Sequence, residues 1–439
     1  MSTQSNLSFR QLLPILTIVF VDSMGFTIVL PIIPFYALAF GATPTVVGLL
    51  LMCYALAQFL FAPILGRWSD RFGRKPVLVV AQIGTFASLL LMGFAWALPL
   101  LFIARTLDGI TGANLSTVQS AISDMTNKEE RARGLGLIGA ASGLGFVFGP
   151  LISGLALRLA DNNYAAPAFL GASFAFVSVM LTIILFRETL PPESRGAPKK
   201  RESVMKTLLT GLRSPLLGPL YLLTFAVQFI FGMFASSFAL FTLNRIGFSS
   251  VDNAIFFGIF GLSLVLMQGV FVGRLVKRFG EYRVLLASFV LSAFGFGLGA
   301  FTPQQAVPWY SESAMIAELS QQGASAAQLA LLPSEAGAGL GAFLFILLTL
   351  LPGPLGFTLQ MPTIHTLITK RVDSTEVGQA LGVSSSFVGA GTVVGPFLGG
   401  LLFDQLAPGA PFAVSAVLSL VLLAVVIRFV QGSTVPQPA

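Results

Sequence analysis

The chain is poor in charge, in histidine and in cysteine. Among its 439 residues, charged side chains make up 10% and hydrophobic ones 55%, and the mean hydropathy is +0.86. A soluble protein of this length could not cover its surface with so few charges, so the composition predicts a membrane protein. The single cysteine, Cys53, excludes an intramolecular disulfide, and one His with one Cys cannot form a metal-binding cluster. The sequence also lacks a nucleotide-binding loop and a nucleophile elbow, so we expect no metal, no cofactor and no enzymatic activity.

Long apolar runs recur along the whole chain. Each is close to the roughly 20 residues that a helix needs to cross a ~30 Å hydrocarbon core, and none alternates as a barrel strand would. We therefore predict an all-α integral membrane protein with about twelve transmembrane helices. The expected spans lie near residues 12–36, 44–65, 76–96, 99–123, 134–157, 167–186, 215–242, 251–272, 283–302, 337–361, 379–403 and 411–430.

The basic residues gather in alternate loops. If the N-terminus is cytoplasmic and the spans alternate, 22 of the 25 Lys and Arg residues fall in cytoplasmic segments. The positive-inside rule thus explains the net charge of +7 without a nucleic-acid partner. We expect a multi-pass protein of the cell inner (plasma) membrane with both termini in the cytoplasm.

Two internal repeats divide the chain. The stretch GRWSDRFGRKPVL at 66–78 returns as GRLVKRFGEYRVL at 273–285, an offset of 207 residues. The stretch GFVFGPLISG at 145–154 returns as GTVVGPFLGG at 391–400, an offset of 246. The difference between the two offsets requires an insertion in the second half. Such duplicated halves are typical of two-bundle transporters.

The repeats and the loop composition predict two six-helix bundles related by pseudo-two-fold symmetry. The first bundle covers residues 1–187, a polar linker follows at 188–214, and the second bundle covers 215–439. The insertion is a polar run at 303–336 that holds acidic residues and no Lys or Arg, which favours the external side.

Three charged residues lie deep inside expected spans, too far from either end to reach water: Asp22, Arg105 and Asp108. Each costs about 2.5–3.5 kcal/mol near a helix centre, so each needs compensation. Arg105 and Asp108 are three residues apart, so they share one helix face. They form either a structural ion pair or a functional pair that takes part in proton or substrate handling.

Asp22 has no charged partner within one turn of its own helix. A carboxylate in an apolar medium favours its neutral, protonated form, which is what a proton carrier needs. Three roles remain open for Asp22: a proton site, a counter-charge for cationic compounds, or a structural bond to a neighbouring helix.

Four motifs stand out in the first half. The loop after the second span has the pattern G-x-x-x-D-R-x-G-R-K, at Gly66, Asp70, Arg71, Gly73, Arg74 and Lys75. The fourth span has R-x-x-x-G, the fifth has G-x-x-x-G-P, and in the first span Asp22 precedes a Leu-Pro pair. The residues of the second and third motifs are Arg105 and Gly109, and Gly145, Gly149, Pro150 and Gly154.

With these motifs the chain resembles, over nearly its full length, the major facilitator superfamily, and in its first half the twelve-helix drug:proton antiporters of that superfamily. The resemblance implies that Arg105 takes part in proton coupling, whereas Asp108 is a departure, because a neutral residue is more usual there. It also implies that the loop at 66–76 is a conformational gate, in which Asp70 contacts the N-terminus of the eleventh span. Orientation of the loop by its basic residues alone is the alternative.

The resemblance predicts a proton-coupled exporter of small lipophilic or amphipathic compounds that works by alternating access as a monomer in the lipid bilayer. A facilitator or symporter of a metabolite or lipid is the alternative. The second half has no acidic residue deep inside an expected span, which counts against tetracycline as the substrate. The expected cavity wall, aromatic with uncharged polar groups, contains Phe26, Tyr36, Asn114, Gln119, Gln228, Phe229 and Phe234.

Overall fold

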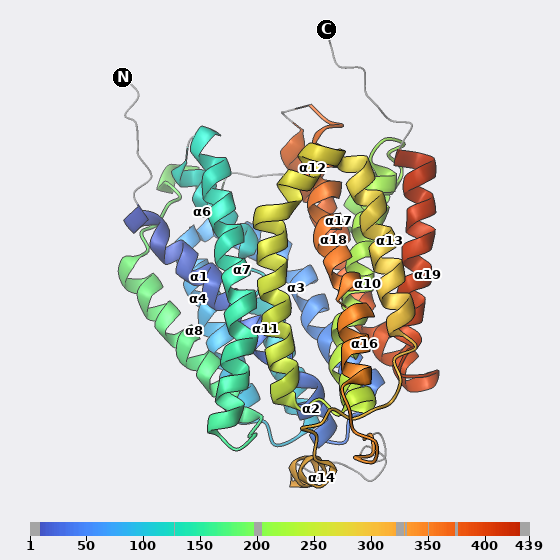
Figure 1. Ribbon diagram of the computed structural model, residues 1–439. Coiled ribbons are helices and arrows are strands. Elements are labelled where there is room, and N and C mark those ends of the chain that lie inside the picture. Colours follow the sequence, from blue (N-terminus) through green and yellow to red (C-terminus); the bar gives the residue numbers. More distant parts are fainter. Residues whose placement is uncertain are drawn as a thin grey trace. The chain divides into compact units, whose positions relative to one another are not determined.

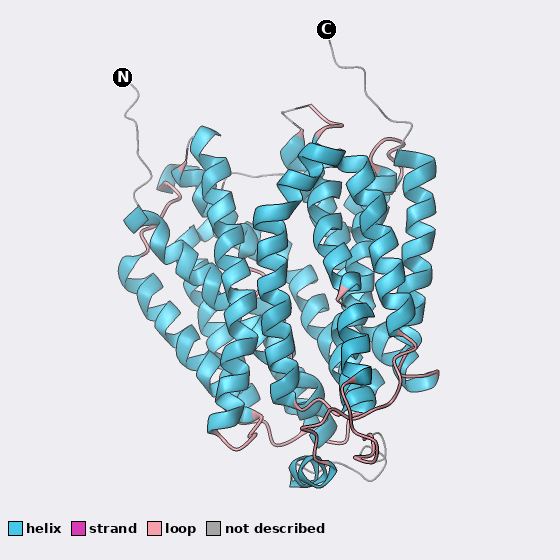
Figure 2. Ribbon diagram, in the orientation of Figure 1, coloured by secondary structure: helices cyan, strands magenta, loops and turns pink. Residues whose placement is uncertain are grey.

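The computed structural model describes residues 9–126, 128–196, 204–321, 329, 332–349, 351–373 and 376–430. Within these ranges every regular element is a helix, and Figure 2 shows no strand. Parts of the predicted linker and insertion lie outside the described residues. The two chain ends, whose cytoplasmic location we predicted, also lie outside them. These parts are residues 1–8, 197–203, 322–328, 330–331 and 431–439.

The helices of the first half follow the apolar runs of the sequence, with one short 3₁₀ turn, η1, after them (Figure 1). They are α1 (Phe9–Val29), α2 (Ile33–Ala39), α3 (Pro44–Phe72), α4 (Arg74–Gly93), α5 (Leu98–Thr111), α6 (Leu115–Met125), α7 (Lys128–Leu159), α8 (Ala165–Leu185) and η1 (Pro192–Ser194).

The second half repeats this pattern and adds a helix, α14, in the insertion. Its elements are α9 (Val204–Leu212), α10 (Gly218–Ile246), α11 (Ser250–Leu266), the π-helical η2 (Met267–Val272), α12 (Gly273–Phe279), α13 (Glu281–Gly299), α14 (Glu312–Gln321), α16 (Gly341–Thr349), α17 (Pro352–Thr369), α18 (Val377–Gln405), α19 (Ala410–Val425) and η3 (Val426–Val430).

Among the described residues, eleven helices are long and apolar enough to cross a membrane. The expected fourth span is absent from this set because it is broken into α5 and α6. At the end of α5, the amide of Gly112 donates to the carbonyl of Asp108 at 2.7 Å. At the start of α6, the carbonyl of Asn114 accepts hydrogen bonds from the amides of Thr117 and Val118. The expected first span is also interrupted, since α1 ends before Pro31, which cannot donate a backbone hydrogen bond.

The chain forms two compact units. The first comprises residues 1–40, 53–200 and 250–265, and the second comprises 41–52, 201–249 and 266–439. Each unit therefore includes a short stretch from the other half of the sequence. The single boundary that we placed in the linker stays a prediction.

Corresponding helices pack in the same way within each unit. In the first unit α1 packs on α7, and α4 packs on both α5 and α8. In the second unit α10 packs on α18, and α13 packs on both α17 and α19. These are the same pairs by position in the repeat, so the internal duplication of the sequence is also a duplication of helix packing.

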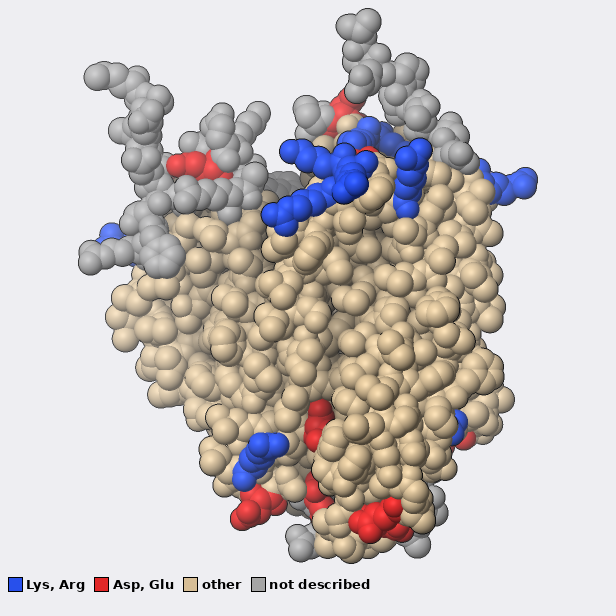
Figure 3. Space-filling view, viewed as in Figure 1, with Lys and Arg blue, Asp and Glu red and all other residues tan. Residues whose placement is uncertain are grey.

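In the second unit, basic and acidic residues gather at opposite ends of the helices. Figure 1 places α12 at one end of this unit and α14 at the other. Lys and Arg gather over α12 (Figure 3), whereas α14 contains Glu312 and Glu318. The insertion therefore lies at the end opposite the basic loop of its own unit, as expected for an external segment.

Candidate functional site

The break in the fourth span places a polar side chain against Asp22. Asn114 is the residue before α6, and it is almost fully buried. Its side-chain amide donates a 2.5 Å hydrogen bond to the Asp22 carboxylate on α1. Asp22 itself is partly exposed within the first unit. The sequence analysis had assigned Asn114 to the cavity wall, and the structure shows that it is also the partner of the proposed proton site.

Arg105 and Asp108 form the ion pair that their spacing predicted. The Nη1 atom of Arg105 lies 2.6 Å from Oδ2 of Asp108, and both side chains are buried. The guanidinium also covers the ring of Tyr54, 4.2 Å from its centroid, and Phe26 stacks on the same ring with 5.1 Å between centroids. A cation over an aromatic face in a dry environment gains about 2 kcal/mol, so Tyr54 helps to hold Arg105.

A second polar residue of α3 connects this aromatic layer to the break. The side-chain amide of Gln58 donates to the Tyr54 hydroxyl and to the carbonyl of Gly112, both at 3.1 Å. The break therefore has polar contacts on two sides, with Gln58 on α3 and Asp22 on α1.

The charges of this site do not balance. It has two carboxylates and one guanidinium, and the guanidinium lies 2.6 Å from one of the carboxylates, that of Asp108. The hydrogen-bond partner of Asp22 is a neutral amide. An ionised Asp22 would leave one net negative charge inside the membrane, which a proton or a cationic compound can neutralise.

The G-x-x-x-G-P motif of α7 fixes the position of α1. A Cβ atom on Gly145 would meet the backbone of Met24 at 2.8 Å, and one on Gly149 would meet the backbone of Ile28 at 2.9 Å. The Thr27 hydroxyl donates to the carbonyl of Gly145 at 2.9 Å. These contacts lie within two turns after Asp22 on α1, whereas Pro150 and Gly154 continue the buried face of α7.

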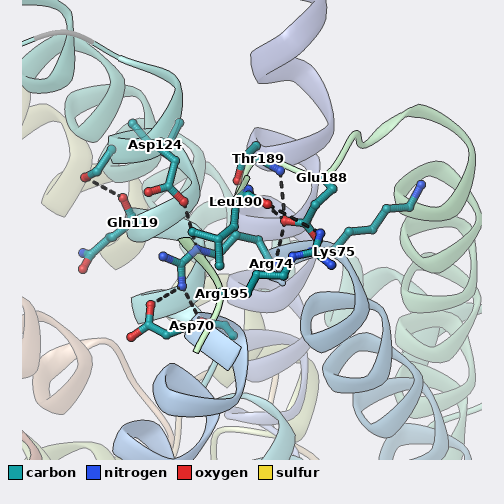
Figure 4. Close-up of polar contacts among 12 residues, drawn as sticks. Asp70, Arg74, Lys75, Gln119, Asp124, Glu188, Thr189, Leu190 and Arg195 are labelled. Atoms are coloured by element: carbon teal, nitrogen blue, oxygen red, sulfur yellow. Dashed lines mark hydrogen bonds and ion pairs between the residues drawn. The ribbon is translucent and has the colours of Figure 1, made fainter. Parts of the chain in front are cut away.

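The other residues assigned to the cavity wall lie in several places. The Tyr36 hydroxyl donates to the carbonyls of Met92 and Ala95 at 3.1 Å, which is a structural contact. Gln119 is exposed and lies next to Asp124 (Figure 4). In the second unit Phe234 is buried among other Phe rings, whereas Gln228 and Phe229 are half-buried. Of the members of this set in the first unit, the structure brings Phe26 next to Arg105 and Asn114 next to Asp22.

The loop at 66–76, which we call the signature loop, is centred on a buried arginine. The Arg74 side chain is 2% exposed and lies 2.6 Å from the carboxylate of Asp70 and 2.9 Å from that of Asp124 (Figure 4). It also donates to the Ser69 hydroxyl at 2.7 Å. Within the loop, the structure therefore pairs Asp70 with Arg74. Arg71 is exposed and covers the ring of Phe72.

The chain reverses at Gly73 and not at Gly66. Both glycines belong to the motif that the sequence places in the loop after the second span, but α3 continues to Phe72, so Gly66 is helical and its carbonyl accepts from the Ser69 hydroxyl. Gly73 has φ +105°, a conformation that favours glycine. Gly280, its counterpart at the offset of 207, has φ +79° and likewise precedes a helix.

Glu188 caps the helix that follows this turn. One carboxylate oxygen accepts from the amide of Arg74 at 2.8 Å and the other from the amide of Lys75 at 3.2 Å. The first oxygen also accepts from the amides of Thr189 and Leu190 at 3.0 Å (Figure 4). Lys75 itself donates through Nζ to the carbonyl of Ile183. An anion at a helix N-terminus is favourable, and here it fixes the beginning of the linker to the signature loop.

Sequence reasoning missed four of these residues. Tyr54 and Gln58 are two polar-tipped residues one turn apart in an apolar run, a signal that could have placed them on an interior face. Glu188 was part of the predicted polar linker, and Asp124, just after the expected fourth span, was not singled out. Their shared partner Arg74 is 50 residues from Asp124 and 114 from Glu188, so no local pattern identifies these contacts.

Duplicated helical units, with a carboxylate and an acid–base pair inside the membrane-spanning region of one of them, define a two-bundle membrane transporter. The sequence matches the family model of the Major Facilitator Superfamily over residues 15–356 and 323–439. The chain therefore belongs to the major facilitator superfamily, and it is a multi-pass membrane protein.

Named relatives cover almost the whole chain. The tetracycline resistance protein, class B, of Escherichia coli is 30% identical over 90% of this chain and 88% of its own. Multidrug resistance protein 1 of Bacillus subtilis (strain 168) is 30% identical over 89% of each chain. Among solved structures, the nucleoside transporter NupG aligns with a TM-score of 0.71 over 96% of this chain and 100% of its own, at 13% identity. This last likeness concerns the fold alone.

Proposed function

We propose that the protein exports small lipophilic or amphipathic compounds in exchange for protons, by alternating access, and that Asp22 is the exchanging group. The relatives named as tetracycline and multidrug resistance proteins support export. The observation that carries the proposal is the unbalanced charge of the site. Because Asp108 compensates Arg105, Asp22 alone is left to take either a proton or a positively charged compound.

Competition for Asp22 couples the two fluxes. A proton arriving from outside displaces the compound, and its release to the cytoplasm prepares the carboxylate for the next one. One proton moving through 100 mV supplies about 2.3 kcal/mol, which supports a roughly 50-fold gradient of a neutral compound. For a compound with one positive charge the exchange is electroneutral, so the pH gradient alone drives it.

The remaining site residues have supporting roles in this proposal. Arg105 and Asp108 form a fixed dipole beside the proton site, Phe26 and Asn114 contact the compound, and Asp70 alternates between Arg74 and a helix of the second half as the conformational gate. We further propose that the protein works as a monomer in the cell inner membrane with both chain ends in the cytoplasm. The gathering of Lys and Arg at one end of the second unit supports this orientation.

The test uses purified protein in liposomes with an imposed pH gradient and ethidium as a fluorescent cationic compound. We expect the wild-type protein to move ethidium against its gradient and to release protons when it binds ethidium in weakly buffered detergent. Asp22→Asn, which keeps the shape of the side chain, should abolish both responses. Asp161→Asn, an exposed substitution in the turn after α7, should change neither. Full pH-driven uptake by Asp22→Asn would refute the role of Asp22, and uptake without proton release would indicate a facilitator.

A further inference from the structure

The signature loop has a charge-inverted copy in the second unit. In the first unit Arg74, at the start of α4, pairs with Asp124 at 2.9 Å. At the repeat offsets of 207 and 246 residues these positions become Glu281, at the start of α13, and Lys370 after α17. Nζ of Lys370 lies 2.6 Å from Oε1 of Glu281. The second loop thus keeps the ion pair of the first with both signs reversed.

The inversion leaves cations unpaired on α12. Asp70 is paired with Arg74 in the first unit, and the residue at its position in the second unit is Lys277. Glu281, an acid one turn further on, already forms an ion pair with Lys370. In the described part of the chain, neither Lys277 nor its neighbour Arg274 has a carboxylate within ion-pair distance, and both are exposed.

These two cations line a hollow on the same helix face. An open cavity of about 460 Å³ is lined by Gly269, Val270, Gly273, Arg274 and Lys277. The hollow exists because two glycines four residues apart have no side chain, and a Cβ atom at either position would meet nothing within 4 Å. The segment also runs through the π-helical η2, a conformation that frequently occurs at functional sites.

The surroundings of the cavity resemble a bilayer interface. The apolar helix from Ser250 ends at Phe279, so Arg274 and Lys277 lie in its last two turns, where we expect a membrane-spanning helix to reach the lipid headgroups. Leu266 and Phe271, on the side towards the membrane interior, are each 49% exposed. Acyl chains would cover such side chains, and Lys and Arg gather at the end of this unit that contains α12 (Figure 3).

We propose that this cavity binds the phosphate headgroup of an anionic phospholipid such as phosphatidylglycerol. The phosphate pairs with Arg274 and Lys277, supplying the negative charge that an acidic side chain supplies in the first unit, and the acyl chains run along the exposed side chains of Leu266 and Phe271. The glycine-lined hollow admits the headgroup next to the backbone. The site is independent of Asp22 and of the exported compound.

The test measures lipid binding to the purified full-length protein by native mass spectrometry, with phosphatidylglycerol and phosphatidylcholine titrated separately. We expect phosphatidylglycerol to bind more tightly. Each cation near a membrane phosphate is worth about five-fold in affinity, so Arg274→Gln with Lys277→Gln should weaken phosphatidylglycerol binding about 25-fold. Gly273→Leu, which fills the hollow without a change of charge, should cause a comparable loss.

The matched control removes two cations of the same region that do not line the cavity, Arg278→Gln with Arg283→Gln, and should weaken binding no more than about two-fold. An equal loss in this control would show that only the general positive charge matters, and would overturn the proposal. Equal binding of the two lipids, or full affinity in Gly273→Leu, would also overturn it. Inorganic phosphate at millimolar concentration should not displace phosphatidylglycerol; if it does, the ligand is a soluble anion and the lipid assignment fails.

Discussion

The cap formed by Glu188 makes a prediction whose size follows from the geometry. Glu188→Ala removes the acceptor of four backbone N–H groups, two of them on α4. Hydrogen bonds to a charged acceptor contribute about 1.5–3 kcal/mol each. The carboxylate is 23% exposed, so water replaces part of the loss, and we expect a total cost of about 2–4 kcal/mol.

Glu188→Gln separates the hydrogen bonds from the charge. The oxygen that remains can accept three of the four bonds, those from Arg74, Thr189 and Leu190. The new amide group faces the N–H of Lys75, so that bond and the favourable interaction with the helix dipole are lost. We expect a cost of about 1 kcal/mol for this variant.

Hydrogen exchange followed by mass spectrometry can read these costs locally, in peptides that cover the first turns of α4. Exchange there should accelerate by about 30-fold or more in Glu188→Ala and by about five-fold in Glu188→Gln. Glu193→Ala, an exposed acid in the same segment, should leave these peptides unchanged. Equal exchange rates in wild-type protein and Glu188→Ala would refute the cap as a link between the linker and the signature loop.

Two further predictions concern the membrane site. Tyr54→Leu removes the ring beneath Arg105, so it should lower the rate of pH-driven ethidium transport about 10- to 30-fold and change the pH profile of transport. Tyr54→Phe keeps the ring and should lower the rate less than about five-fold. Identical pH profiles for the two variants would contradict a positioning role of Tyr54. Gly149→Val overpacks the contact between α7 and α1 and should cost about 1–3 kcal/mol, seen as a lower midpoint of thermal unfolding in detergent. Gly136→Val, on an open face of the same helix, is the control, and an equal shift for both would argue against the contact.

The sequence was sufficient where the signal is local or repeated. Apolar run length identified the membrane helices, and the spacing of Arg105 and Asp108 gave their ion pair. It was insufficient where the partner comes from another helix. The break at 112–114 lies in an apolar run, with no proline to mark it, and its consequence is that Asn114 reaches Asp22. The capping role of Glu188 depends on Gly73, whose missing side chain leaves room for the carboxylate.

The two repeats differ in a way that separates scaffold from chemistry. Positions with a backbone constraint are retained: Gly73 and Gly280 both have positive φ before a helix. A Cβ atom at Gly395, the counterpart of Gly149, would likewise press on a neighbouring helix backbone, within 3.2 Å of Met233. These residues cannot change without a clash or strain.

Charged positions obey a weaker rule than these glycines: an ion pair persists when both of its members change sign. Glu281 with Lys370 satisfies this rule, whereas Lys277 does not, and an external phosphate would restore the balance there. Asp22 is a different case, because the residue at its position in the second half is Phe229, which has no charge at all. The second copy thus forms its fold without a charge at this position. In the first copy the hydrogen bond from Asn114 does not neutralise Asp22, and this uncompensated charge argues for a role of Asp22 in transport.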